Sequence, residues 1–331
     1  MKIRSIYRYI LPIFLTLLIS CEYEVPGLRG VEDEGMLYVR ILAGVYDTTA
    51  ISVSPTSPIR QEKMELPVME TSIEMTVNGK TAAIQKAEYK NGSSLPEGTL
   101  YTTVPIKPGD RLAVSATSYG SAPIHAETVM PGEAPEFDVV LQQVRISPDE
   151  YKEYINVFGG YVIHQSDAVR FSVKFKDDPE TEDRYALRLI KYTTENNGWE
   201  ISVDESAGFL VREHNDLSIS DRMPLFLFKD IFGASSIPHS SLVLTYFTDS
   251  NLNGQEIEKE YMMFHEDGFR YRVQLFRLSE ELYNAAEASY LMNMSTLGTV
   301  GMAPIYPYTN IKGGLGCFAA ASMRETAILD L

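Results

Sequence analysis

Short segments in which apolar and polar residues alternate recur along this chain, and they constrain its fold more than any other feature. The segments Val169–Phe175 and Phe269–Leu275 both place apolar residues at every second position. An alternation of period two puts the apolar side chains on one face of a β-strand. The pattern therefore predicts a mainly β protein.

Turn sequences divide the first part of the chain into short strands. Asn78–Gly79 is a strong hairpin signal, and Lys107–Asp110 is a good turn that should join two paired strands. Strands of this length and spacing predict an Ig/fibronectin-like β-sandwich over residues 36–131. The expected strands are Met36–Leu42, Ile73–Val77, Tyr101–Ile106, Leu112–Ala116 and His125–Met130.

A Pro/Gly-rich stretch, Pro131–Pro135, marks a boundary, after which residues 136–331 predict a second β-rich domain with one or two short helices. Ser147 should cap a helix that runs to Gly159–Gly160, and Ser279 should cap another that ends near Met294. A hairpin is expected over Asn253–Gly254. The expected strands are Phe137–Ile146, Val169–Phe175, Tyr185–Tyr192, Leu242–Thr248, Glu258–Phe264, Phe269–Leu275 and a short one around Phe318.

The first 20 residues are typical of an export signal. A basic start is followed by the apolar run Ile10–Ile19 and then by Leu18-Ile19-Ser20-Cys21. The run is about half the roughly 20 residues that a membrane-spanning helix needs. The order of these features predicts a bacterial lipoprotein signal peptide, residues 1–20, with a lipid attached to Cys21. An ordinary signal peptide followed by a chance cysteine is the alternative.

Residues 21–35 are polar, contain glycine and proline, and predict a tether between the lipid and the fold. The formal net charge of −16 argues against nucleic acid as a partner. The chain has two cysteines. If Cys21 carries lipid, Cys317 has no disulfide partner, and we interpret it as a small core residue.

Four segments carry a resemblance to a known family: Phe171–Pro179, Arg184–Leu189, Tyr271–Ser279 and Asn310–Gly316. Together with the cysteine signal, they resemble the domain-of-unknown-function 4249 family of Bacteroidetes outer-membrane lipoproteins. The resemblance runs from Cys21 almost to the end of the chain. It implies an accessory role beside a TonB-dependent outer-membrane transporter, and it brings no catalytic residues.

One motif has the spacing of a calcium-binding loop. Asp249, Asn251, Asn253 and Glu260 offer oxygen ligands at the first, third, fifth and twelfth positions, with Gly254 at the sixth. Position eight is Glu256 instead of an aliphatic residue, and the flanking segments predict strands instead of helices. A hairpin turn at Asn253–Gly254 is the favoured interpretation, and calcium binding is the alternative.

Other candidate sites are weak. The glycines of Gly313–Gly316 lack the lysine and hydroxyl of a phosphate-binding loop, and the five histidines are scattered without metal-ligand spacing. Gly233–Ile237 comes closest to a hydrolase nucleophile elbow but lacks the second glycine. The sequence therefore predicts no catalytic, cofactor or metal site, and lipidation of Cys21 as the modification.

The cysteine signal and the β pattern predict a non-enzymatic, lipid-anchored accessory or binding lipoprotein. The family resemblance implies that it lies at the outer membrane, periplasmic or surface-exposed, and works with a TonB-dependent transporter in nutrient uptake. Its expected partners are the membrane, through Cys21, and that transporter. A structural or adhesive cell-surface protein is the alternative. A hydrolase with a site built from distant residues is a third possibility.

Overall fold

Strands dominate the structure, which is a computed structural model. Its described residues form three sheets and one helix, α4 (Glu280–Thr296). The expected mainly β class is confirmed. The described residues are 36–55, 71–88, 97–118, 121–146, 154–156, 166–194, 200–203, 210–212, 245–249, 252–264, 269–296 and 308–331.

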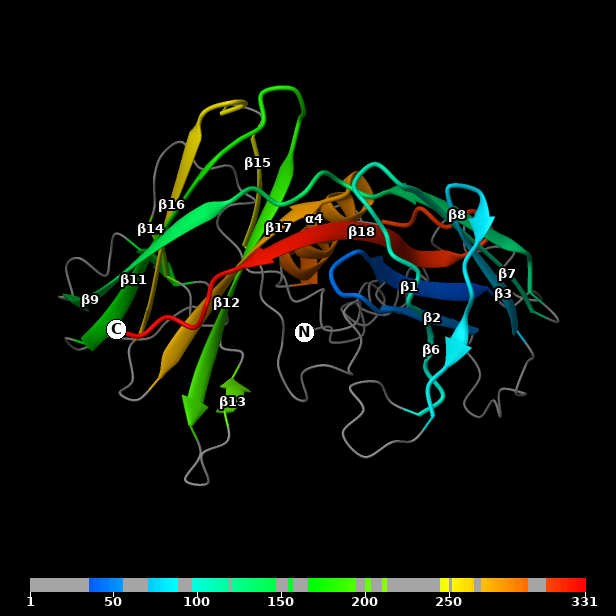
Figure 1. Cartoon of the computed structure of the whole chain (residues 1–331), viewed down its shortest axis with the longest axis horizontal. Helices are drawn as coiled ribbons and strands as arrows, with labels where there is room; N and C mark the ends of the chain where they lie inside the picture. The colour runs from blue at the N-terminus through cyan, green and yellow to red at the C-terminus, as the bar shows by residue number, and fades with distance from the viewer. Residues whose placement is uncertain are drawn as a thin grey trace, which may run out of the picture.

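A nine-stranded sheet, the long sheet, contributes strands to both halves of the molecule (Figure 1). It combines strands from both predicted domains, and the boundaries of those domains stay a prediction. Its order is β13 (Glu200–Val203), β12 (Arg184–Thr194), β17 (Arg270–Leu278), β18 (Leu315–Glu325), β1 (Leu37–Ala43), β2 (Thr49–Pro55), β6 (Leu100–Thr102) and β5 (Gln85–Lys86), with β15 (Thr245–Thr248) also paired to β12.

The N-terminal part of this sheet packs against a four-stranded sheet and forms a first sandwich. Leu37, Val39 and Ile41 of β1 meet Met75 and Val114 of the opposite layer in one buried core. Each such side chain contributes about 1.5–3 kcal/mol when it is fully buried. The second sheet has the order β4 (Lys80–Thr81), β3 (Thr71–Val77), β7 (Arg111–Ser118) and β8 (Ile124–Val129).

The other end of the long sheet packs against a five-stranded sheet and forms a second sandwich with an aromatic core. Phe171 lies edge-on to Tyr271, with ring centroids 5.4 Å apart, and Phe175 lies edge-on to Tyr185 at 4.9 Å. Aromatic pairs favour this geometry. The five-stranded sheet has the order β10 (Tyr154–Asn156), β14 (Leu210–Arg212), β16 (Glu256–Phe264), β11 (Ser166–Lys176) and β9 (Phe137–Ile146).

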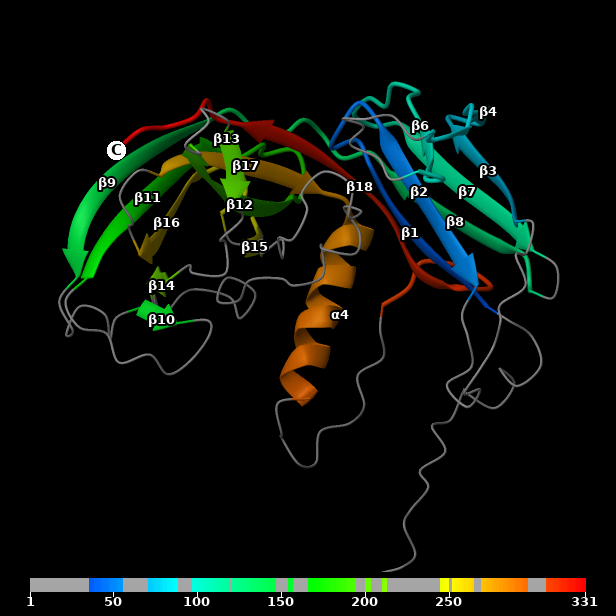
Figure 2. The ribbon, with the colours of Figure 1, turned by 90° about the horizontal axis from the view of Figure 1, so that it is seen from below.

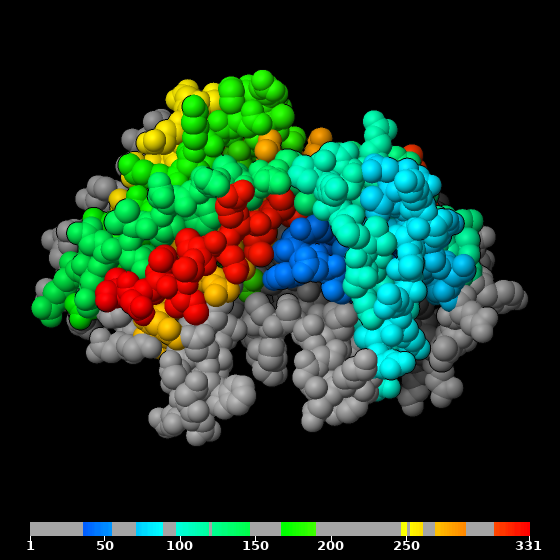
Figure 3. Space-filling model, in the orientation of Figure 1, coloured from blue at the N-terminus to red at the C-terminus, as the bar shows by residue number. Residues whose placement is uncertain are grey.

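Strand β18 connects the two sandwiches and is covered on both faces. Phe318 and Ala320 point into the first core, whereas Cys317, Ala319 and Ala321 face α4. A strand covered on both faces carries a continuous apolar run, and here small residues let the helix approach. The helix starts at the expected cap, because Ser279 Oγ accepts from the backbone N–H of Leu282 at 3.4 Å. Figure 2 shows α4 on the underside of the long sheet, and Figure 3 shows the C-terminal part of the chain, in red, at the surface beside the first described residues, in blue.

The expected Asn78–Gly79 hairpin is confirmed, because both residues have the positive φ that this turn needs and β3 pairs with β4. The pairing of Tyr101–Ile106 with Leu112–Ala116 is wrong. β6 pairs with β2 and β5, whereas β7 pairs with β3 and β8. Residues 103–110 cross between the two layers, and Val104 and Ile106 pack against the core on the way.

The hairpin expected over Asn253–Gly254 is wrong in the same way. The turn exists, but β15 pairs with β12 in the long sheet, and β16 pairs with β11 and β14 in the other layer. The helix expected after Ser147 does not include residues 154–156, which form β10. Its other residues lie outside the described ranges. Strand β18 has 11 residues, so it is longer than the short strand expected around Phe318.

Within the described ranges, no helix combines the length and the apolar character needed to cross a lipid bilayer. The helix α4 carries Glu280, Glu281 and Glu287 and serves as a packing element of the fold.

Candidate functional site

The described residues bring three aspartates together at one end of the second sandwich. Asp177 follows β11, Asp183 precedes β12, and Asp249 follows β15, so the strands of two opposite layers deliver them to the same place. One carboxylate oxygen from each lies within 4.8 Å of the others. The three side chains are only 2%, 6% and 1% exposed, which closes them to any large solute.

Arg277, on β17, supplies the positive charge of this carboxylate network. Its Nε donates to Asp183 Oδ1 at 2.7 Å, and a second guanidinium nitrogen lies 2.6 Å from the same oxygen. The guanidinium also donates to Thr181 Oγ1 at 2.7 Å and to the Glu133 carbonyl at 3.4 Å. Arg277 therefore joins the end of the second sandwich to the Pro131–Pro135 boundary segment.

Neutral donors satisfy most of the remaining oxygens. The Tyr185 hydroxyl donates to Asp177 Oδ1 at 2.6 Å, and the Gly254 backbone N–H donates to Asp177 Oδ2 at 2.8 Å. The Asp183 N–H donates to Asp249 Oδ2 at 2.9 Å, and Thr181 Oγ1 donates to Asp183 Oδ2 at 3.0 Å. Five of the six carboxylate oxygens thus accept a hydrogen bond from the chain itself.

The charges of the network favour a bound proton. Three buried carboxylates face one guanidinium, and excess buried charge is costly. Burial raises the pKa of Asp249, and the nearby charges of Asp177 and Asp183 raise it further, against the lowering effect of the Asp183 N–H. Burial likewise raises the pKa of the Tyr185 hydroxyl, which keeps it a donor. Because the chain's own donors fill the oxygens, the arrangement suits a proton on Asp249 better than a metal ion.

The residues with calcium-loop spacing do not form such a loop. Asp249 joins the carboxylate network, and the Asn253 side-chain amide donates to the Thr181 carbonyl at 3.1 Å. Glu260 lies on β16 and forms an ion pair with Arg170 at 3.5 Å. Asn251 lies outside the described ranges. Strands, not helices, flank the turn, so the motif forms a connection between two layers.

The last segment of the family resemblance, Asn310–Gly316, contacts strands of two sheets. The Asn310 side chain accepts from the Phe318 N–H at 3.0 Å and donates to the Phe318 carbonyl at 2.7 Å, as a neighbouring strand would. Lys312 exchanges two backbone hydrogen bonds with His125 on β8. The backbone of this segment is therefore engaged in the fold.

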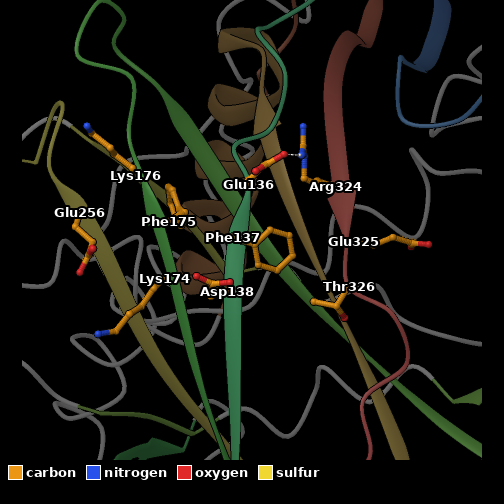
Figure 4. A pocket seen from close by; sticks show the side chains of 10 residues that line it. All are labelled: Glu136, Phe137, Asp138, Lys174, Phe175, Lys176, Glu256, Arg324, Glu325 and Thr326. Carbon is orange, nitrogen blue, oxygen red and sulfur yellow. Dashed lines mark hydrogen bonds and ion pairs between the residues drawn. The ribbon is translucent and has the colours of Figure 1, made fainter.

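A cavity of about 550 Å³ lies between the start of β9 and the end of β18 (Figure 4). Phe137 faces it from β9, and Glu325 and Thr326 border it on the opposite side. Its charges are mixed, and several are already paired: Arg324 with Glu136 at 2.8 Å, and Lys174 with Glu258 at 3.0 Å. The lining does not select a ligand of one charge.

Two cysteines and a surface histidine remain. Cys317 is buried against α4, and burial raises the pKa of its thiol to about 12, so it is an inert core residue as expected. Cys21, the predicted lipidation site, lies outside the described ranges, and its acylation stays a prediction. Among the described residues, His125 sits on the surface with Glu127 at 2.9 Å.

The sequence did not indicate the carboxylate network. Asp183 and Arg277, which form its ion pair, are 94 residues apart. Charged pairs are frequent in an acidic chain, so local spacing carries no signal for this one.

The described part of the chain thus forms two β-sandwiches that share one sheet. The buried carboxylate network lies at one end of the second sandwich. A family model for "Domain of unknown function (DUF4249)" matches residues 23–327, and the chain belongs to this family. The match confirms the family resemblance of the sequence. No curated protein matches the chain.

Proposed function

We propose that this protein is a non-enzymatic accessory or binding lipoprotein of the outer membrane, anchored by lipid on Cys21 and working with a TonB-dependent transporter in nutrient uptake. The observation that carries the proposal is the order of the N-terminal features: a basic start, a short apolar run, Leu-Ile-Ser-Cys21 and a polar segment. The family match supports it, since it begins at residue 23, two residues after that cysteine.

The geometry of the described body suits a tethered protein. Strand β1 begins at Leu37 in the middle of the long sheet, so the first described residues are fixed firmly in the fold. Fifteen residues, 21–35, would separate the lipid from that point, and a fully extended chain of this length reaches about 50 Å. The acyl chains would anchor the protein at about 0.8 kcal/mol for each buried methylene. The chain, with a formal net charge of −16, is repelled by anionic lipid, so the body would stand away from it.

The arrangement of ionisable groups supports a non-enzymatic role. The carboxylate network is closed to solvent and its oxygens are occupied by donors of the chain, so a substrate could not reach them. The exposed His125 pairs with Glu127 on a regular strand instead of a cleft. General acid–base catalysis needs such groups within hydrogen-bond reach of a bound substrate.

A pull-down tests the proposal. The full-length, acylated protein would be isolated from detergent-solubilised native membranes, and its partners identified by mass spectrometry. A TonB-dependent transporter in stoichiometric amount is the expected result.

Two cysteine variants serve as controls for the pull-down. Cys21→Ala removes the anchor and should lose the transporter, whereas Cys317→Ala changes a buried core residue and should retain it. If the anchored wild type comes out without a transporter, the accessory role is wrong, and a structural or adhesive surface protein replaces it.

A further inference from the structure

Within the described part of the chain, strand β9 has an open edge along its whole length. It is the last strand of the five-stranded sheet, and all ten of its residues pair with β11, from Phe137 opposite Phe175 to Ile146 opposite Ser166. Among the described residues, no strand pairs with its other edge. Open edges present unpaired N–H and C=O groups, and proteins usually protect them with charges, proline or bulges.

The sequence of β9 lacks this protection at its centre. The six residues between Asp138 and Arg145 are Val-Val-Leu-Gln-Gln-Val, without charge, glycine or proline. Val140 points away from the core and is 62% exposed, more than any other large apolar side chain in the described part. Such an uncharged segment of high β-propensity is suited to pairing with another strand.

The C-terminal segment does not pair with this edge. Thr326 and Leu329 form their backbone hydrogen bonds with Val273 and Tyr271 of β17 instead. The cavity of about 550 Å³ separates the first residues of β9 from Glu325 and Thr326 (Figure 4). The described neighbours therefore leave the hydrogen-bonding groups of β9 available.

We propose that the edge of β9 is an interface with a second copy of this chain, in which two β9 strands pair antiparallel about a twofold axis. The pairing would join two five-stranded sheets into one continuous sheet. The sequence of β9 favours an antiparallel copy, because Asp138 and Arg145 lie near opposite ends of the strand and each would face an uncharged residue of the other copy. A parallel pairing would bring like charges together.

Strand geometry limits the register. Residues that face each other across a strand pair lie on the same side of the sheet, so twofold pairing joins residues of equal parity. Centring the pair on Gln142 sets Val140 opposite Val144 of the second copy, twice. It also sets Gln142 opposite its own equivalent, where two amides can exchange hydrogen bonds. Centring the pair on Leu141 would set Val140 of each copy opposite Gln142 of the other, so each exposed valine would face a polar side chain.

Disulfide trapping tests this interface. In the pairing centred on Gln142, the two Cα atoms of this residue lie about 4.5–5.5 Å apart, within reach of a disulfide. The full-length Gln142→Cys chain in native membranes should shift to twice the chain mass on non-reducing gels after mild oxidation. Ser172→Cys, one strand further into the sheet, is the matched control and should remain at the mass of one chain, as should the parent chain.

A charge at the edge provides a second test. Val140→Lys places a cation at the centre of the interface, and its exposure lets the fold tolerate the change. It should abolish the dimer of the solubilised wild type on native gels. Val129→Lys, on the edge strand β8 and 49% exposed, should leave the dimer intact. The proposal is overturned if Gln142→Cys traps no more dimer than Ser172→Cys, or if the Val140→Lys chain dimerises like the wild type.

Discussion

At the scale of single residues, the buried carboxylate network shows where the sequence stops being informative. The signal at Cys21 can be recognised because its basic start, apolar run and cysteine are adjacent in the sequence. Lipidation of Cys21 stays a prediction. The network of Asp177, Asp183, Asp249 and Arg277 is assembled from four strand ends. Nothing in the local sequence distinguishes these aspartates from the other acidic residues of the chain. Only the packing of two sheets brings them together.

The raised pKa of Asp249 predicts how stability depends on pH. Burial and two neighbouring carboxylates raise this pKa above its ordinary value of 3.8, so the folded state favours the protonated form. The stabilisation is complete below pH 3.8 and is lost as the pH rises through the raised pKa in the folded state. Asp249→Asn keeps a neutral group that can donate to Asp177 and accept from the Asp183 N–H. Its melting temperature should therefore decline less between about pH 4 and pH 7 than that of the wild type.

Calorimetry over this pH range would measure the difference, and Arg277→Met is the control. Removing the guanidinium leaves Asp183 buried without its partner, which costs about 3–5 kcal/mol. This variant should be destabilised at neutral pH, where Asp249→Asn is not. Parallel pH profiles for the wild type and Asp249→Asn would show that Asp249 holds no proton.

At the scale of elements, strands were easier to predict than their partners. The alternating segments gave β9, β11 and β17 in the right places, because β9, β11 and the first residues of β17 each bury one face. The turns at Lys107–Asp110 and Asn253–Gly254 were also correct, but both were assigned to hairpins. A turn residue determines that the chain reverses, and it does not determine whether the next strand joins the same sheet or the opposite one. That choice depends on which core each strand covers.

The length of β18 has a related cause. Its small residues, Ala319 to Ala321, look weak as strand formers in isolation. They are buried because a parallel neighbour, β1, lies on one side of the strand and α4 covers one of its faces. Tertiary packing thus decides the structure of this element.

Gly316 limits how β18 pairs with β1. It has a φ of +102°, and a Cβ at this position would overlap the Val39 carbonyl oxygen. Gly316→Ala should therefore lower the free energy of unfolding by more than the roughly 1–3 kcal/mol of backbone strain alone. Denaturant titration measures this loss. Gly109→Ala is the control, because Gly109 also has a positive φ but has open space around its Cβ position. Equal losses for both variants would show that the approach of β1 imposes no limit.

At the scale of the whole molecule, one long sheet is shared by two sandwiches. β1 and β18 lie side by side at its centre although they come from opposite ends of the described chain. A shared central sheet predicts that the described body unfolds cooperatively, and it also fixes the point where the proposed tether leaves the fold. The sequence resemblance identified the family correctly, but it did not indicate that two sandwiches share one sheet.

The measurement that most directly tests the central claim is acylation of Cys21. Cells expressing the full-length chain would be supplied with labelled palmitate. Label is expected on the wild type and on Cys317→Ala, because the Cys317 thiol is buried, and it should be absent from Cys21→Ala. A wild type without label, or a Cys21→Ala variant that retains it, would contradict the account of a lipid-anchored protein.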